Sequence, residues 1–274
     1  MEKLEAALEK ARRARMASNT GVDGAPLAPG PARSRKGEDW SALPEVDITP
    51  ERIQQGRIAA LIGGRDATPY DMLRSRTIRL MKDASWRRLA VTSPNAACGK
   101  TTVSLNLALS LARQKDTRVM LIDLDLRRPA MHKLIGSKTA RSFHEVLEGK
   151  ADFAEVAVRI GSNLIIAANA TASRHPAEVL HSVQSREMLV KLEAQWRPDI
   201  MIFDMSPMLA SDDNVGFLGN VDCALLIAAA ESTTLQSIDI CEKELAQLTN
   251  VLGVVLNKCR YGDNSSGYGY EEYD

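Results

Sequence analysis

The stretch Arg88–Thr102 constrains the fold most, because a short apolar strand there runs through a small-residue loop into a helix. Leu89–Val91 is the predicted strand, and Gly99–Thr102 begins a helix rich in leucine. Strand, loop, Gly-Lys-Thr and helix in this order are typical of a phosphate-binding loop, where backbone N–H groups and the positive helix end face an anion. In such a loop Lys100 would contact the β- and γ-phosphates, and the hydroxyl of Thr101 would ligate Mg²⁺.

The residues expected to surround a nucleotide belong to this loop and to the first turn of its helix. They are Asn95, Ala96, Ala97, Cys98, Gly99, Lys100, Thr101 and Thr102. The loop departs from the full pattern, because Pro94 stands where a glycine is usual and Ala96–Cys98 replaces further glycines. A Gly-Lys-Thr triplet also occurs by chance, so the prediction of nucleotide binding depends on the rest of the chain.

Composition narrows the class of protein. Lys+Arg and Asp+Glu are equal at 35, so no overall basic field indicates nucleic acid as a partner. The cysteines are scattered, which predicts free thiols rather than a zinc site or a disulfide framework. Apolar runs such as Cys223–Ala230 are far shorter than the roughly 20 residues of a membrane helix, and the N-terminus lacks a signal-peptide core. We therefore expect a cytoplasmic protein that reaches a membrane only through a partner.

After the loop, apolar strands alternate with helical patterns, which predicts an α/β fold. The strands are expected at Val119–Ile122, Leu164–Ala167, Ile200–Phe203, Ala224–Ala228 and Val251–Leu256. The helices are expected at Ser142–Leu147, Ser185–Trp196, Asp213–Leu218 and Leu235–Leu248. Strands that are apolar on both faces indicate a mostly parallel twisted sheet, covered by helices on each side, as in P-loop NTPases. Ligands of such sheets lie at the carboxyl ends of the strands.

Three aspartates follow strands of this predicted sheet. Asp123 and Asp125 end one strand and point the same way along an extended chain. Two neighbouring carboxylates need a cation, and Lys100 with Mg²⁺ would supply it, although an aspartate pair that only caps a turn is an alternative. Asp204 follows four apolar residues, the Walker B arrangement that holds the Mg²⁺ shell. Asn257 ends the last strand and either reads an adenine amino group or simply closes the strand.

Composition also divides the chain into segments. Residues 1–17 read as a charged amphipathic helix, which either is solvated or docks on a surface. Residues 18–68 are rich in proline and glycine and are expected to be a disordered linker. The P-loop domain is then expected at 69–258, opening with a basic amphipathic helix from Pro69. Residues 259–274 are expected to be a flexible tail.

The tail is the most unusual segment in composition. It holds four of the chain's five tyrosines among glycine, serine and acidic residues. No packed core requires tyrosines there, so we interpret them as phospho-acceptors, although a merely adhesive terminus is the alternative. The four are Tyr261, Tyr268, Tyr270 and Tyr273.

Taken together, the motifs resemble the bacterial tyrosine kinases (BY-kinases) of capsule and exopolysaccharide synthesis. That family has a Walker A loop, then an hhhDxDxR motif matched by Met120–Arg127, then an hhhDxxP motif matched by Met201–Pro207. Arg174–Leu180 is similar to the family's NPxExL region. The resemblance covers the chain from about Tyr70 to its end and is specific because three motifs occur in order. It implies a stand-alone kinase whose membrane adaptor is a separate protein of polysaccharide chain-length control.

The subunit-contact motif of the family, ExxRxxR, is matched poorly. In the helix before the loop this chain has Asp71-x-x-Arg74-x-x-Thr77. Glu9-x-x-Arg12-x-x-Arg15 fits the pattern but lies in the N-terminal segment. Either set is a candidate for contacts in the homo-oligomer that the resemblance implies.

The resemblance implies a mechanism with ATP and Mg²⁺. Lys100 would hold the β/γ-phosphates, Thr101 and Asp204 would position the metal, and one of Asp123 and Asp125 would join them. The other would accept the tyrosyl proton, and Asp125 is our choice for this base. The neighbour's tail, and other protein substrates, would receive the phosphoryl group.

Two other readings compete with the kinase. A ParA/MinD-type ATPase switch shares the sheet and the aspartates, but usually has a second lysine early in the loop, where this chain has Pro94 and Asn95. A non-catalytic nucleotide-binding scaffold of the polysaccharide export machinery is the other alternative.

Overall fold

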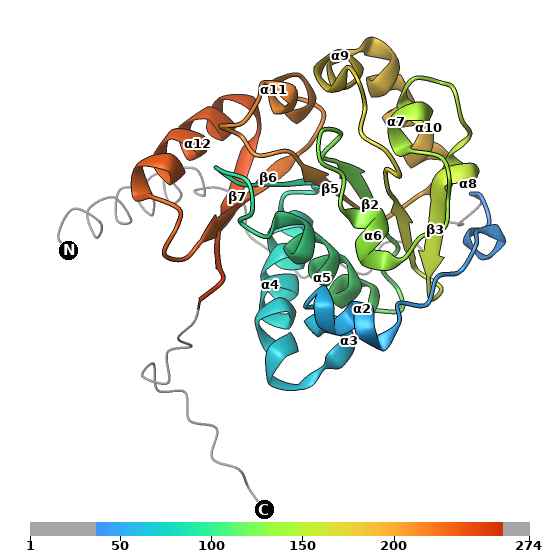
Figure 1. Cartoon of the computed structure of the whole chain (residues 1–274), viewed down its shortest axis with the longest axis horizontal. Coiled ribbons are helices and arrows are strands. Elements are labelled where there is room, and N and C mark those ends of the chain that lie inside the picture. The colour runs from blue at the N-terminus through green and yellow to red at the C-terminus, as the bar shows by residue number, and fades with distance from the viewer. Residues whose placement is uncertain (1–36, 260–274) are drawn as a thin grey trace, which may run out of the picture. The chain divides into compact units, whose positions relative to one another are not determined.

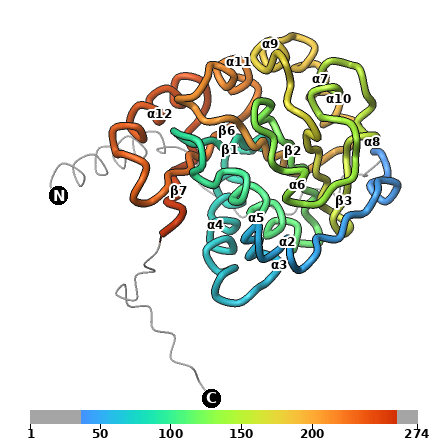
Figure 2. Tube along the Cα trace, in the orientation of Figure 1, coloured from blue at the N-terminus to red at the C-terminus, as the bar shows by residue number. Residues whose placement is uncertain are grey.

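A computed structural model describes residues 37–259 of the chain. In this range a seven-stranded sheet runs in the order β3-β4-β2-β5-β1-β6-β7 (Figures 1 and 2). All neighbouring strands are parallel except β3 and β4, which are antiparallel. The strands are β1 (Arg88–Thr92), β2 (Val119–Leu124), β3 (Ala157–Ile160), β4 (Leu164–Ala167), β5 (Ile200–Met205), β6 (Cys223–Ala229) and β7 (Asn250–Asn257).

Helices cover both faces of the sheet, and each face has its own apolar core. One core packs under α7 (Phe143–Leu147), α10 (Val183–Trp196) and α12 (Leu235–Leu248). The other packs under α4 (Gly64–Asp83) and α5 (Lys100–Ala112). The remaining elements are η1 (Trp40–Ala42), α2 (Pro50–Gln55), α3 (Ala59–Ile62), α6 (Met131–Ile135), α8 (Phe153–Val156), α9 (Pro176–His181) and α11 (Asp213–Leu218). The predicted α/β class and its parallel sheet are confirmed.

The last strand differs from the expectation of burial on both faces. β7 lies at the edge of the sheet, and its side chains Val254 and Leu256 are 47% and 60% exposed. An edge strand has a neighbour on one side only, and these two side chains are left open to solvent.

The expectation of a linker over 18–68 is wrong for residues 37–68, which are ordered and packed. Trp40 is 2% exposed, and its indole Nε1 donates to the backbone oxygen of Trp196 at 2.9 Å. The guanidinium of Arg118 lies 4.4 Å from the centre of the same ring. Ile58 is fully buried against the second core. Prolines and glycines surround these residues in the sequence. Their packing partners are distant along the chain, so the sequence alone does not indicate that they are buried.

The first long helix also begins earlier than expected. α4 starts at Gly64, and Pro69 lies inside it as the sixth residue, beyond the first four N–H groups that have no acceptor within a helix. The linker expected over 18–36, the helix expected over 1–17 and most of the tail lie outside the described residues. None of the helices in residues 37–259 is long and apolar enough to cross a membrane.

Asn106 joins the N-terminal segment to the helix of the phosphate loop. This fully buried side chain accepts from Ala60 N at 2.9 Å and donates to Arg57 O and Thr102 O at 3.1 and 2.9 Å. Together with the burial of Ile58 and Ala60, it makes α3 part of the domain.

We expect Asn106→Ala to lower the free energy of unfolding by about 2–4 kcal/mol, because it leaves buried backbone groups without partners. Urea unfolding measures the loss, and limited proteolysis should show faster cleavage within residues 49–62. The matched control is Asn220→Ala, whose side chain is half-buried and accepts from Arg186 on the opposite face. Equal stability of the two variants would contradict the role of Asn106.

Candidate active site

The two aspartates predicted to share a site lie side by side in the sheet. β2 and β5 are neighbours, and their register places Asp123 directly opposite Asp204. β1, which leads into the phosphate loop, lies on the other side of β5 and places Val91 opposite Asp204. Both carboxylates are nearly inaccessible, at 0% and 1% exposure. The fold therefore gathers the loop and both acidic strand ends at one edge of the sheet.

Lys100 connects the loop to these carboxylates. Its Nζ donates to Asp125 Oδ2 at 2.8 Å, and both side chains are nearly buried. Burial acts to lower the pKa of Lys100, but the charges of Asp204 and Asp125 outweigh it and raise the pKa. The ammonium group is therefore permanently charged and faces the aspartates, where a phosphate would also be neutralised.

The aspartates have unused acceptor oxygens that fit a divalent cation. Asp123 Oδ2 and Asp204 Oδ2 are buried and accept no hydrogen bond from any residue in 37–259. Buried carboxylate oxygens are rarely left without a partner, and oxygen ligands are those that Mg²⁺ prefers. Thr101 at the start of α5 adds a hydroxyl beside Asp204. Asp123, Asp204 and Thr101 are therefore a suitable donor set for Mg²⁺.

The pKa shifts of Asp123 and Asp204 agree with a site for a divalent cation. Burial, with the neighbouring charges of Asp204 and Asp125, raises the pKa of Asp123 well above its usual range. Burial raises the pKa of Asp204 to about 6, although Lys100 and hydrogen bonds from Thr101 and Ser104 oppose it. Without a metal ion the site holds more negative charge than Lys100 balances.

This gives a pH-dependent expectation for the metal-free protein. A folded-state pKa raised above the unfolded value stabilises the fold at low pH, and that stability is lost as pH rises from about 4 through about 6. Asp204→Asn removes this loss, so in EDTA it should gain about 1–3 kcal/mol relative to wild type between about pH 5 and about pH 7.5. Thermal unfolding at both pH values measures the gain. A difference that does not change with pH would contradict the raised pKa.

The phosphate loop is held from both sides. Met208 N donates to Ser93 O at 2.8 Å and Leu209 N to Pro94 O at 3.1 Å, so the segment after β5 braces the start of the loop. Pro94 is buried, whereas the predicted loop members Asn95, Ala96 and Ala97 are exposed. The proline thus occupies the base of the loop and leaves the exposed backbone to a ligand.

Asn257 contacts the loop rather than lying apart at a strand end. Its Nδ2 donates to Cys98 O at 2.9 Å, and a side chain at Gly99 would meet that nitrogen at 2.3 Å. Gly99 has a φ of +89°, a conformation that favours glycine, and a Cβ there would clash with Asn257. Both constraints require glycine at this position. Cys98 is 2% exposed, with Sγ 3.6 Å from Thr233 Oγ1. Asn257 therefore holds the loop, and its predicted role in adenine recognition remains a proposal.

Two further residues support the aspartates and were not found from the sequence. Asn169, after β4, is fully buried, donates to Asp123 O at 2.8 Å and accepts from His144 N at 2.9 Å. Asp213, at the start of α11, binds the Arg127 guanidinium through two hydrogen bonds of 2.7 and 2.9 Å. An asparagine after a strand was the only available signal for Asn169. Asp213 lies in Ser-Asp-Asp-Asn, which reads as an ordinary helix start.

The weak subunit-contact match in α4 is occupied by contacts within the chain. Asp71 accepts from Arg74, Ser110 and Arg113 at 3.0, 2.6 and 2.9 Å. Thr77 is fully buried. These residues fasten α4 to α5, so their proposed use between subunits would require them to exchange partners. The alternative set on the N-terminal segment and the four tail tyrosines lie outside the described residues.

The comparisons with known proteins agree with the site. The model of the CobQ/CobB/MinD/ParA nucleotide binding domain matches residues 89–271. The chain therefore belongs to this family of nucleotide-binding domains.

Several of the similar proteins are named tyrosine kinases. The chain is 27% identical over 230 residues to tyrosine-protein kinase Wzc of Salmonella typhi, covering 82% of this chain and 31% of that protein. It is 29% identical over 205 residues to tyrosine-protein kinase YwqD of Bacillus subtilis, covering 73% and 84%. The kinase domain of the Escherichia coli tyrosine kinase Etk superposes with a TM-score of 0.66 at 27% identity, covering 76% and 82%. The resemblance to BY-kinases is confirmed, and the chain spans about a third of the Wzc length.

Proposed function

We propose that this protein is an ATP-dependent protein-tyrosine kinase that phosphorylates the C-terminal tyrosines of another copy of itself. The observation that carries the proposal is the pairing of Lys100 with Asp125 beside two buried carboxylates that each have one oxygen without a partner, in a chain whose last residues include a tyrosine cluster. The names of its relatives, tyrosine-protein kinases, support the same activity. By resemblance, the kinase regulates polymerisation and export of an exopolysaccharide.

The residues have distinct tasks in the proposed reaction. Lys100 and the loop residues 95–102 bind and orient the nucleotide phosphates, and Asn257 keeps the loop in position. Asp123, Asp204 and Thr101 hold Mg²⁺, which when bound neutralises charge on the phosphates. Asp125 accepts the proton of the tyrosyl hydroxyl, and its hydrogen bond with Lys100 is given up in that step. The phenol oxygen then forms a bond to the γ-phosphorus, the bond to the β-phosphate oxygen breaks, and ADP leaves.

The proposal includes partners that the similarity supports only in general. The protein would assemble with copies of itself and dock on a separate membrane protein of polysaccharide chain-length control, in the cytoplasm. Each phosphorylation adds about 1.5–2 negative charges to the tail. Repulsion between a modified tail and the acidic site would favour release and loosen the assembly.

Incubation of the purified protein with Mg-ATP, followed by mass spectrometry, tests the proposal. Phosphotyrosine is expected at Tyr261, Tyr268, Tyr270 or Tyr273. Replacement of all four by phenylalanine should abolish the tail label and leave nucleotide binding intact. ATP hydrolysis without tyrosine label would favour a ParA/MinD-type switch, and binding without either reaction would favour a scaffold.

A further inference from the structure

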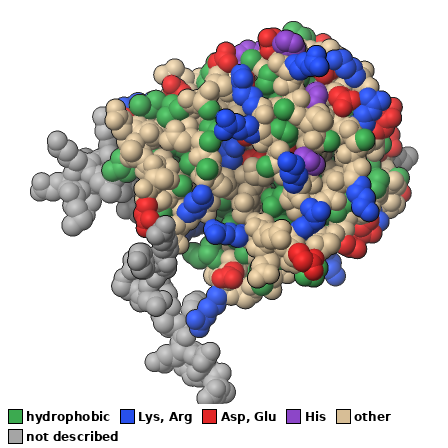
Figure 3. Space-filling view, viewed as in Figure 1, with side chains coloured by type: hydrophobic (Ala, Val, Ile, Leu, Met, Phe, Trp, Pro, Cys, Tyr) green, Lys and Arg blue, Asp and Glu red, His purple; other side chains and the backbone are tan. Residues whose placement is uncertain are grey.

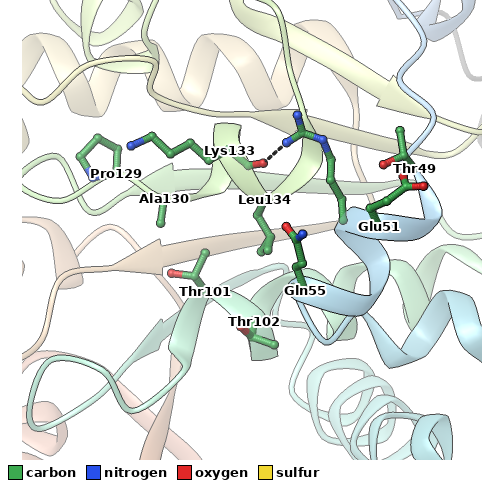
Figure 4. Close-up of a pocket in the computed structure, with 11 residues that line it drawn as sticks. Thr49, Glu51, Gln55, Thr101, Thr102, Pro129, Ala130, Lys133 and Leu134 are labelled. Atoms are coloured by element: carbon green, nitrogen blue, oxygen red, sulfur yellow. Dashed lines mark hydrogen bonds between the residues drawn. The ribbon is translucent and has the colours of Figure 1, made fainter.

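A cavity lies beside the phosphate loop and extends beyond it to α2 and α6. It has a volume of about 720 Å³ and is lined by Thr101 and Thr102, by the segment Pro129–Leu134 and by α2 (Figure 4). Binding sites for small ligands and side chains commonly have volumes of about 300–1,000 Å³. One wall thus comes from α2, and Asn106 ties Arg57 and Ala60, which follow α2 in the chain, to the helix of the loop.

The cavity lies at the end of the site where the terminal phosphate belongs. Asn257 contacts the loop from β7, on one side of β1 in the sheet. Lys100 points the opposite way, to Asp125 after β2, and lysines of such loops contact the β- and γ-phosphates. The segment that follows Asp125 leads directly to Pro129 and α6, which form the cavity wall.

The charges at the cavity are mostly positive. Lys133 is exposed and, in the described part of the chain, pairs with no carboxylate. Arg52 of α2 is also exposed and donates to the backbone oxygen of Lys133, which joins the two walls (Figure 4). Glu51 is the one acidic residue in the lining. An acidic segment would therefore find two cations and one carboxylate at the entrance.

We propose that this cavity binds the acceptor: a tyrosine flanked by acidic residues, from the C-terminal segment of a second copy. That segment carries Glu271, Glu272 and Asp274 around Tyr270 and Tyr273. Lys133 and Arg52 contact the carboxylates, and the phenol enters between Thr101 and Pro129. The inference rests on the proposed kinase activity and adds the place and the charge preference of acceptor binding.

The test uses the full-length protein with Mg-ATP and two synthetic peptides, GYGYEEYD and its neutral analogue GYGYQQYN. For wild type, kcat/KM of the acidic peptide is expected to exceed that of the neutral peptide about tenfold, as charge complementarity at close range allows. Lys133→Glu should remove most of this preference through KM. Gln55→Glu, on the α2 wall, should also reduce the preference for the acidic peptide. It replaces Lys133→Glu as the test if that variant folds poorly.

Lys115→Glu is the matched control, because Lys115 is exposed beyond the far end of α5. It should keep the preference, and all three variants should bind a fluorescent ADP within about twofold of wild type. The proposal is overturned if Lys133→Glu and Gln55→Glu keep the preference, or if they weaken both peptides equally.

A failure of the kinase assignment has a different signature. If wild type binds ATP but labels no tyrosine, the kinase proposal fails. Fluorescence anisotropy of the labelled acidic peptide, measured with Mg-ADP present, then tests whether the cavity binds this peptide. Binding that weakens in Lys133→Glu supports the acceptor site, and no binding to wild type overturns it.

Discussion

Replacing Lys100 with methionine is expected to lower the rate of tyrosine phosphorylation by at least about a thousandfold, the loss seen when a preorganised charge is removed from a transition state. The ammonium group is the one cation in the described range that contacts the buried Asp125, Asp123 and Asp204 group, and it would also face the transferred phosphoryl group. Methionine fills a similar volume, so the loss would come from the charge.

The same substitution should change stability in a pH-dependent way. The charge of Lys100 acts to lower the pKa of Asp123 and of Asp204, so without it these two carboxylates hold a proton more firmly. The variant should therefore lose more stability at about pH 8 than at about pH 6 when no metal is present.

Quantitative phosphotyrosine analysis measures the rate, and circular dichroism confirms the fold. Lys115→Met is the control, because it removes an exposed charge away from the ligand edge of the sheet. Full tail labelling by Lys100→Met would exclude the proposed site.

The second large effect is expected at Asp213, which touches no predicted ligand. Asp213 is 1% exposed and binds Arg127 through both carboxylate oxygens. Arg127 is two residues from Asp125, so the pair fixes the segment on which the proposed base lies. Asp213→Asn should lower kcat about tenfold with little change in KM for ATP, because it loosens the base without removing a phosphate contact.

A double-mutant cycle separates this role from general damage. If Asp213 acts through Arg127, the effects of Asp213→Asn and Arg127→Gln on kcat should not add. Asp212→Asn, an exposed neighbour, is the matched control and should be neutral. Additive losses, or a loss confined to stability, would assign Asp213 a structural role alone.

The sequence predicted the central strands and the two ligand-edge aspartate motifs because their signals are local. Continuous apolar runs ended at Asp123 and Asp204, and a parallel sheet brings such ends together. Asp213 and Asn169 could not be found in this way. Their importance depends on tertiary partners, Arg127 and the backbone of Asp123, that no sequence period indicates.

The N-terminal boundary failed for a related reason. Trp40 and Ile58 are buried in opposite cores. Trp40 stands among prolines and charges, and the apolar residues around Ile58 are interrupted by Gly56, Gly63 and Gly64, so composition favoured a linker. Because α2 was assigned to the linker, the cavity wall that it forms could not be predicted, and the acceptor site could be inferred only from the structure.

The bond between Asn257 and the phosphate loop has a kinetic consequence. Because β7 ends at this bond, the described chain ends beside its own nucleotide site, and the tyrosines proposed as acceptors follow within one short stretch of sequence. A short flexible tether would give such tyrosines an effective concentration of about millimolar at that site. A neighbour's tail can dominate only if assembly raises its local concentration further or if the tether cannot reach the acceptor cavity. The dependence of the initial labelling rate on protein concentration, first order or second order, therefore reports the assembly state of the kinase.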